Sequence, residues 1–346
     1  MNFSEITGKL ESGAALDGPE IDAAFAALMD GAVEHDAAKR FLELTVSHMG
    51  DPALIAGGAN ALRERMVKVH APEGAIDVCG TGGDGAHTLN VSTAVAFVLA
   101  GCGVPVAKHG NRAMSSKCGA ADVLEALGVT LTGDAATLER CLSEANVAFL
   151  FAQNHHPAMR HVAAARKELG SRTIFNLLGP LSNPAGVKRQ IVGVFAPEFM
   201  RPIAEALRLL GSERAMALHG AGGLDELSFA NSGQNRCVLF DGDNIEELTL
   251  DQEQIAHAFG VTLMPISALA GGDAQQNASV LKSLLDNHLH KSAYESTVLL
   301  NAMQALALAD RAQSADEAWE MASESIRSGA ARAALDKLVA ISAGAP

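Results

Sequence analysis

A glycine-rich segment carries polar groups that could hold an anion. Residues 77–101 read DVCGTGGDGAHTLNVSTAVAFVLAG, in which the glycines and Asp84 precede an apolar run that predicts a helix opening near Ser92. Glycines allow a backbone to approach an anion closely, and Asn90, Ser92 and Thr93 would offer donors at the helix N-terminus. An acid in such a loop suggests a metal ion. A tight strand-to-helix turn without a ligand is the alternative.

A second segment concentrates cations and hydroxyls. Residues 108–128, KHGNRAMSSKCGAADVLEALG, follow another predicted strand. Because ligands of open α/β sheets bind at the carboxyl ends of the strands, we expect this loop to meet the glycine-rich loop over one phosphate site. The alternative is a solvated basic loop. The groups concerned are Lys108, His109, Asn111, Arg112, Ser115 and Ser116.

Two common nucleotide-binding motifs do not fit the first segment. Gly80, Gly82 and Gly85 satisfy G-x-G-x-x-G, but the helix opens well after them and Asp84 would face a bare pyrophosphate. After the next strand, Lys108 stands where a ribose-binding carboxylate is needed. A P-loop is excluded because the segment lacks GK[ST].

Two further positions suggest ligand binding. Asp225 and Glu226 lie in HGAGGLDELS, a glycine-rich loop after a predicted strand, and Mg²⁺ prefers carboxylate oxygens together with substrate phosphates. A solvated acidic pair is the alternative. Arg166 interrupts an apolar stripe at helical spacing, formed by Met159, Val162, Ala163 and Leu169. Its guanidinium could fork onto a substrate carboxylate or form an internal salt bridge. For His155-His156-Pro157 we favour a helix-entry role over a metal site.

The elements that must position these groups alternate between strand and helix. About four helices are predicted between Ser4 and Val69, with Asp17 and Asp51 as N-caps. After Ala71-Pro-Glu-Gly, short apolar runs alternate with helical stretches, which indicates an α/β fold with a mainly parallel central sheet and flanking helices. The predicted strands are Ile76–Cys79, Val104–Lys108, Val147–Ala152, Gln190–Phe195, Ala215–His219 and Ile245–Leu250.

Composition excludes several classes of protein. The 346 residues are 48% hydrophobic and 19% charged, which excludes a disordered chain. A net charge of −14 disfavours nucleic acid as a partner. The N-terminus lacks a signal pattern and no apolar run is long enough to span a membrane, so we expect a cytoplasmic protein. Five widely spaced cysteines, Cys79, Cys102, Cys118, Cys141 and Cys237, are interpreted as reduced and buried.

The motifs together resemble the anthranilate phosphoribosyltransferase family. GTGGDG, NVST, KHGNR with SS, and DVLEALG are followed in order by FNLLGPLSNPAGVKRQIVGVF, HGAGGLDELS, GGDAQQNA and VLLNA. The resemblance therefore covers nearly the whole chain. It implies transfer of the 5-phosphoribosyl group from phosphoribosyl pyrophosphate to the amine of anthranilate in L-tryptophan biosynthesis. It also implies Mg²⁺, two ions per site, and a homodimer.

The resemblance assigns roles to individual residues. Ser92, Asp225 and Glu226 match magnesium ligands. Gly80, Asn111 and Arg166 match anthranilate contacts, with His109 and Pro180 near the path of the aromatic substrate. Positions matching the phosphoribosyl pyrophosphate site are Gly80, Gly83, Asp84, Thr88, Asn90, Val91, Ser92, Thr93, Lys108, His109, Gly110, Asn111, Arg112, Ala113, Met114, Ser115, Ser116 and Ala120.

The resemblance also implies a domain division. A small, mainly α-helical domain is expected at residues 1–71, completed by about 168–188, and a large α/β domain at 72–167 and 189–346. Two other functions share this architecture. The first is a pyrimidine nucleoside phosphorylase, against which NLLGPLSNP and GLDEL argue. The second is a non-catalytic nucleic-acid-binding relative, whose groove should be basic.

Three departures from the family pattern stand out. Ala120 replaces a frequent serine in KCGAAD, which removes one possible phosphate donor, and Gln153 replaces a common proline. KSAYES at 291–296 replaces the usual KGAYRD. This last change lies far from the proposed chemistry, so we expect it to affect local packing rather than activity.

Overall fold

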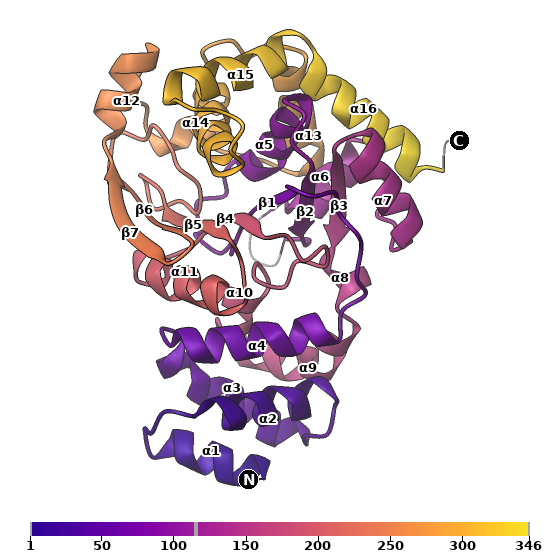
Figure 1. Cartoon of the computed structure of the whole chain (residues 1–346), viewed down its shortest axis with the longest axis vertical. Helices are drawn as coiled ribbons and strands as arrows, with labels where there is room; N and C mark the ends of the chain where they lie inside the picture. The colour runs from indigo at the N-terminus through magenta and orange to yellow at the C-terminus, as the bar shows by residue number, and fades with distance from the viewer. Residues whose placement is uncertain (1, 114–116, 345–346) are drawn as a thin grey trace.

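Four helices begin the chain and lie together at one end of the molecule (Figure 1). The structure is a computed structural model that describes residues 2–113 and 117–344. The predicted caps are confirmed: the Asp17 side chain accepts the Glu20 N–H at 3.0 Å, and Asp51 accepts the Ala53 N–H at 2.8 Å. The elements are α1 (Phe3–Glu11), α2 (Gly18–Met29), α3 (His35–Thr45), the short η1 (Val46–His48) and α4 (Pro52–Glu64).

The central sheet is mainly parallel, which confirms the predicted fold class. Its order is β3-β2-β1-β4-β5-β6-β7; the first five strands are parallel, and β6 and β7 are added in antiparallel fashion. The strands are β1 (Ile76–Gly80), β2 (Val106–Gly110), β3 (Val147–Phe151), β4 (Arg189–Gly193), β5 (Arg214–His219), β6 (Asn235–Asp241) and β7 (Asn244–Leu250).

All six predicted strands occur, and one further strand was missed. β6 pairs with β7 as a hairpin through Gly242, whose φ of +59° suits glycine. β2 begins later than predicted, after Pro105. That proline has no N–H to donate, but its carbonyl accepts the Ile76 N–H at 2.9 Å.

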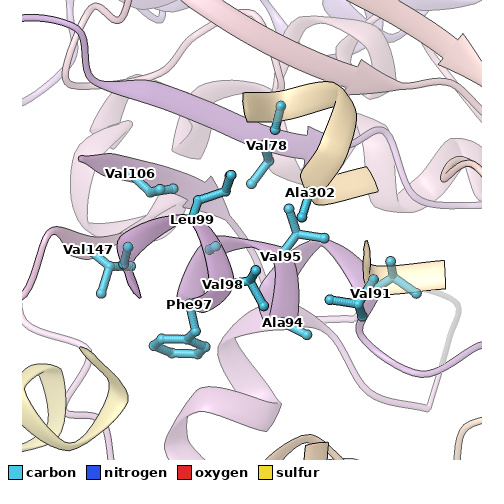
Figure 2. Close-up of a cluster of buried hydrophobic side chains, with 14 of the residues drawn as sticks. Val78, Val91, Ala94, Val95, Phe97, Val98, Leu99, Val106, Val147 and Ala302 are labelled. Carbon is cyan, nitrogen blue, oxygen red and sulfur yellow. The ribbon is translucent and has the colours of Figure 1, made fainter. Parts of the chain in front are cut away.

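Alternate side chains of the strands enter two separate cores. Val78 and Met216 face the first core, whereas Cys79, Ala215 and Ala217 face the second. In the first core α5 (Val91–Gly101) packs beneath β1 and β2, and Figure 2 shows its Val95, Val98 and Leu99 among strand residues. The second core joins the N-terminal helices to α9 (Arg160–Leu169), α10 (Phe175–Leu178) and α11 (Met200–Leu209).

The remaining helices cover the sheet and connect its strands. They are α5 (Val91–Gly101), α6 (Ala120–Ala126), α7 (Ala135–Glu144), α8 (Ala152–His155), α9 (Arg160–Leu169), α10 (Phe175–Leu178), α11 (Met200–Leu209), α12 (Gln252–Phe259), α13 (Ala274–Leu285), α14 (Ala293–Leu308), α15 (Ala315–Arg327) and α16 (Ala330–Ser342). Three single turns, η2 (Pro157–Met159), η3 (Pro197–Phe199) and η4 (Ile266–Leu269), complete the list.

The apolar segments and the cysteines are accounted for within the fold. In the part of the chain that the structure describes, no helix has both the length and the apolar character needed to cross a bilayer. Within the described residues no disulfide bond joins any two of the five cysteines; four of them are buried and Cys102 is half-buried.

We expect Leu99→Ala to lower the free energy of unfolding by about 2–5 kcal/mol, because Leu99 is fully buried and its truncation leaves a cavity under the sheet. Leu209→Ala is the control, since that leucine is 58% exposed and its loss should cost less than about 0.5 kcal/mol. Urea denaturation followed by circular dichroism measures both. Equal losses for the two variants would contradict this core assignment.

Candidate active site

Three loops meet at the carboxyl edge of the sheet. The glycine-rich loop follows β1, the KHGNR loop follows β2, and the loop carrying Asp225 follows β5. Asp225 Oδ2 accepts the Gly82 N–H at 2.8 Å, and the Thr81 N–H donates to the Gly193 carbonyl at the same distance. Loops that follow β1, β4 and β5 are thereby bonded to one another.

Two glycines make this close approach possible. A Cβ at Gly80 would overlap the Asp225 carboxylate, and a Cβ at Gly193 would overlap the Asp225 carbonyl oxygen. Neither position needs a positive φ, so the glycines are required by space and not by backbone conformation. The glycines at the ends of β1 and β4 therefore allow the loop that carries Asp225 to pack against these strand ends.

A cluster of three carboxylates results. One ligand atom each from Asp84, Asp225 and Glu226 lies within 4.8 Å of the others. Burial, followed by repulsion from Asp84, raises the pKa of Asp225 to about 6, and burial, followed by repulsion from Asp225, raises that of Glu226 well above its usual range. Glu226 Oε2 is buried without a hydrogen-bond partner among the described residues. This set of unneutralised oxygens fits a divalent cation.

Ser92 and Lys108 lie beside the carboxylates. Ser92, Asp225 and Glu226 line one small cavity. Lys108 Nζ donates to the Val78 carbonyl at 2.7 Å and to Ser92 Oγ at 3.1 Å. Lys108 is buried, and this burial lowers the pKa of its ammonium. The lysine is thus held inside the sheet edge and not in the solvent.

The helix that follows the glycine-rich loop begins where the sequence indicated. Asn90 is the N-cap residue of α5, and its Oδ1 accepts from Asn277 Nδ2 at 3.0 Å. The next residues turn inward: Val91 is buried, and Thr93 Oγ1 is buried without a partner among the described residues. Thr88, earlier in the loop, forms an isolated antiparallel bridge with Ala270.

The loop after β2 is organised by acids of α6. Arg112 pairs with Asp122 at 3.0 Å and with Glu125 at 2.9 Å, and these partners raise the pKa of its guanidinium. The Ala113 N–H donates to Asp122 Oδ2 at 3.0 Å, and Asn111 Oδ1 accepts the Arg112 N–H at 2.8 Å. Gly110 ends β2, and Ala120 begins α6. Met114, Ser115 and Ser116 lie outside the described residues.

His109 contacts His156, for which the sequence predicts only a helix-entry role. His109 Nε2 lies 3.2 Å from His156 Nε2, and burial lowers the pKa of both imidazoles, that of His156 to about 4. His155 points elsewhere, with its Nδ1 2.8 Å from the Val67 carbonyl oxygen. The two adjacent histidines therefore make contacts in different places. The contact of His156 with His109 makes it part of the site, a role that its sequence context does not indicate.

A buried carboxylate behind the site was also missed. Asp77 accepts hydrogen bonds from the His109 N–H at 3.2 Å, from Asn183 Nδ2 at 2.8 Å and from Gln190 Nε2 at 3.0 Å. Burial raises the pKa of Asp77 to about 6. Gln190 Nε2 also donates to the Pro180 carbonyl at 2.7 Å, so Pro180 and the backbone of His109 are linked through the hydrogen-bonded pair Gln190 and Asp77. The sequence signal that could have identified Asp77 is an acidic residue within the otherwise apolar strand segment IDVCG.

Arg166 lies half-buried on α9, and its guanidinium is 5.4 Å from the Phe175 ring centre. The guanidinium makes no hydrogen bond or ion pair with any residue that the structure describes, and burial lowers its pKa. The predicted stripe is wrong at one position, since Ala163 is exposed and Ala165 is buried instead. The internal salt bridge considered from the sequence is not formed with a described residue.

One more arginine reaches the glycine-rich loop. Arg172 donates to the Gly83 carbonyl, and its guanidinium stacks 4.2 Å from the Phe195 ring centre. Its position in the short polar segment Ser171-Arg172-Thr173 after Gly170 gives no sequence signal of a binding role. Gly83 itself has a φ of +78°.

Comparison with known proteins links this arrangement to one family. Residues 72–332 match the family model described as the glycosyl transferase family a/b domain. A curated relative from Xanthobacter autotrophicus, named anthranilate phosphoribosyltransferase, is 46% identical over 98% of this chain and 96% of its own length. One of the same name from Novosphingobium aromaticivorans is 49% identical over 94% of this chain and 96% of its own length.

Solved structures agree with the sequence relatives. Anthranilate phosphoribosyltransferase from Thermus thermophilus superposes with a TM-score of 0.89 at 39% identity, covering 98% of this chain and 99% of that one. The Saccharomyces cerevisiae enzyme, solved in complex with phosphoribosyl pyrophosphate and Mg, gives 0.89 at 27% identity, covering 99% and 98%.

The carboxylate cluster predicts how stability depends on pH and metal. In the absence of metal, the raised pKa of Asp225 stabilises the fold below its ordinary pKa, about 4, and this contribution is lost as pH rises through about 6. We expect Mg²⁺ to raise the melting temperature at pH 8, and Asp225→Asn with Glu226→Gln to remove that increase while leaving the protein folded. Differential scanning fluorimetry with EDTA or Mg²⁺ measures this.

Asp243→Asn serves as the control, because Asp243 is exposed and lies in a distant turn. It should keep the full response to Mg²⁺. An equal Mg²⁺ shift in the double variant would exclude these carboxylates as ligands.

Proposed function

The chain belongs to the anthranilate phosphoribosyltransferase family, and on this premise we propose how its residues divide the work of the reaction. The chain is a glycosyltransferase of L-tryptophan biosynthesis. It transfers the 5-phosphoribosyl group of phosphoribosyl pyrophosphate to the amine of anthranilate, giving N-(5-phosphoribosyl)anthranilate and pyrophosphate. The reported relatives are named anthranilate phosphoribosyltransferase, so they support neither of the two alternatives, a pyrimidine nucleoside phosphorylase and a nucleic-acid-binding protein.

The metal site is the best supported of the individual assignments. The yeast enzyme binds Mg, and the three carboxylates here carry a buried oxygen that lacks a partner among the described residues. We assign Ser92, Asp225 and Glu226 as ligands, with Asp84 beside them, for two Mg²⁺ ions. The ions would neutralise negative charge on the pyrophosphate. The carboxylates would hold these ions beside the loops that follow β1 and β5.

The donor substrate is assigned to the two strand-end loops. Phosphates are expected against backbone N–H groups of the glycine-rich loop and the start of α5, where the helix dipole favours negative charge. In the second loop Arg112 is held by Asp122 and Glu125, so it would present its remaining N–H groups without first being ordered. The proposed contacts are Gly80, Gly83, Asp84, Thr88, Asn90, Val91, Ser92, Thr93, Lys108, His109, Gly110, Asn111, Arg112, Ala113, Met114, Ser115, Ser116 and Ala120.

The acceptor is assigned to the other side of the same edge. An arginine without an ionic partner among the described residues, half-buried over Phe175, suits the carboxylate of anthranilate. Gly80, Asn111 and Arg166 would contact the acceptor, and His109 and Pro180 would lie along its path. Because burial lowers the pKa of His109 and of His156, both imidazoles are neutral and add no positive charge next to the amine of anthranilate.

The chemistry is a displacement at ribose C1. The bond from C1 to the anthranilate nitrogen forms with inversion as the C1–O bond to pyrophosphate breaks, and the nitrogen then loses a proton. The transition state is rich in oxocarbenium character, and no covalent enzyme intermediate is needed. The loops stabilise the charge of the departing pyrophosphate, while Arg166 and Asn111 orient the amine.

We propose that residues 1–71, completed by a returning segment that the resemblance places at about 168–188, form the small domain, and that the rest of the chain forms the large one. Because α9 contacts α3 and α2, we propose that this returning segment begins earlier, at Arg160. From the family resemblance we also propose a homodimer in the cytoplasm, with no membrane or nucleic-acid partner; light scattering of the purified chain tests the dimer.

The overall reaction is tested in one cuvette. We expect anthranilate fluorescence to fall when the chain, phosphoribosyl pyrophosphate and Mg²⁺ are all present, and to stay constant when any one of them is omitted. Inorganic phosphate with a pyrimidine nucleoside should give no release of base. Phosphorolysis without consumption of anthranilate would overturn the assignment.

Arg166→Ala should raise the anthranilate KM about tenfold or more, because a charge-assisted contact worth about 1.5–3 kcal/mol is lost. The KM for phosphoribosyl pyrophosphate should barely change. Lys167→Ala is a matched control on the exposed side of α9. Steady-state kinetics and a thermal melt of each preparation decide the role: an unchanged anthranilate KM with a lowered melting temperature would make Arg166 structural.

A further inference from the structure

A second cavity is lined by residues other than those of the substrate and metal site. It has a volume of about 450 Å³ and is enclosed by α12, η4, the first half of α14, and α15. Figure 1 shows these helices at the end of the molecule opposite α1–α3. The volume is within the range of small-molecule sites, and none of its lining residues is assigned above to substrate or metal.

One wall of the cavity is aromatic. The rings of Phe259 and Trp319 are stacked, with centroids 4.4 Å apart and planes 13° apart, and Phe229 meets Trp319 edge-on at 6.4 Å. Val261, Ile266 and Leu299 extend the apolar lining. Such a surface suits a flat aromatic ring.

Another part of the lining consists of buried polar residues from the first turns of α14. Glu295, Ser296 and Thr297 line the cavity and are 7%, 6% and 1% exposed. Glu295 Oε2 accepts the Lys291 N–H and lies 3.8 Å from His290 Nδ1, while Oε1 accepts no hydrogen bond from a described residue. The Ser296 hydroxyl likewise has no partner within residues 2–113 and 117–344.

A cation stands next to this carboxylate. Lys291 lines the cavity and is exposed, and its ammonium makes no ion pair with a described residue. Arg327, by contrast, is already paired with Glu320 and Glu324. Lys291 and Glu295, whose ammonium and Oε1 have no partner among the described residues, therefore both line this cavity. These residues are those of KSAYES, the departure from the family pattern.

We propose that this cavity binds an aromatic amino acid as its zwitterion. The ring lies against Phe259 and Trp319, the ligand ammonium donates to Glu295, and the ligand carboxylate is held by Lys291. Opposite charges at one end and stacked rings at the other select against simple aromatic hydrocarbons and against small aliphatic amino acids. Binding is non-covalent and separate from the anthranilate site.

Isothermal titration calorimetry of the full chain with L-tryptophan tests the site. We expect saturable binding of one ligand per chain that excess anthranilate does not displace. Indole, which lacks both charges, and glycine, which lacks the ring, should each bind at least about tenfold more weakly. With L-phenylalanine as ligand, the fluorescence of Trp319, the only tryptophan in the chain, should change on binding.

Variants separate this cavity from other sites. Lys291→Met and Glu295→Gln should each raise the dissociation constant for L-tryptophan about tenfold, whereas Lys68→Met, at an exposed lysine remote from the cavity, should not. Lys291 is exposed, so its variant should fold, and unchanged anthranilate turnover checks this. Absence of binding, displacement by anthranilate, or an affinity for L-tryptophan in both variants equal to that of the unaltered chain would overturn the proposal.

Discussion

The contact between the Asp225 loop and the ends of β1 and β4 is the constraint on which the site depends. Gly80 and Gly193 leave room for the Asp225 carboxylate and carbonyl, and the Gly82 N–H ties the carboxylate in place. This contact brings Asp225 and Glu226 within reach of Asp84. Without a cation, the arrangement concentrates like charges in a buried space, as the raised pKa values reflect. The fold therefore holds a costly arrangement that a divalent ion would relieve.

A second buried carboxylate supports the acceptor side. The Asp77 carboxylate accepts hydrogen bonds from His109 in β2, Gln190 in β4 and Asn183 in the segment after α10. These three segments are therefore held by one side chain. Asn183 also donates to the Ala107 carbonyl at 2.8 Å. Removing one partner of such a network leaves buried polar atoms unsatisfied, which costs more than the net value of a single hydrogen bond. The loop containing Pro180 is thereby held against the sheet.

Much of this architecture can be predicted from the sequence, because its signals are local. Apolar runs between helical stretches identify five parallel strands, and Asp17 and Asp51 identify helix starts. The strand Asn235–Asp241 was missed although Asp241-Gly242 is a hairpin signal. His156 and the partners of Asp77 could not be found, since their meeting depends on sheet order and not on spacing. Ala163 was predicted on the buried face of α9, but Val162 and Ala165, three residues apart, form that face and Ala163 is exposed.

Helix α14 connects the two ligand regions that the structure presents. It is buried over most of its length. Its Tyr294 hydroxyl donates to the Asn90 carbonyl at 3.1 Å. The Asn301 side chain accepts the Leu227 N–H at Oδ1 and donates from Nδ2 to the Leu227 carbonyl. The first turns of the same helix line the aromatic cavity, and η4 bonds to the glycine-rich loop through Leu89 and Leu269 at 2.9 Å. A ligand in the cavity would alter turnover only if its contacts with α14 differ between two arrangements of the substrate loops. Because close packing leaves α14 little room to move alone, any displacement at Glu295 would also reach Asn90 and Leu227.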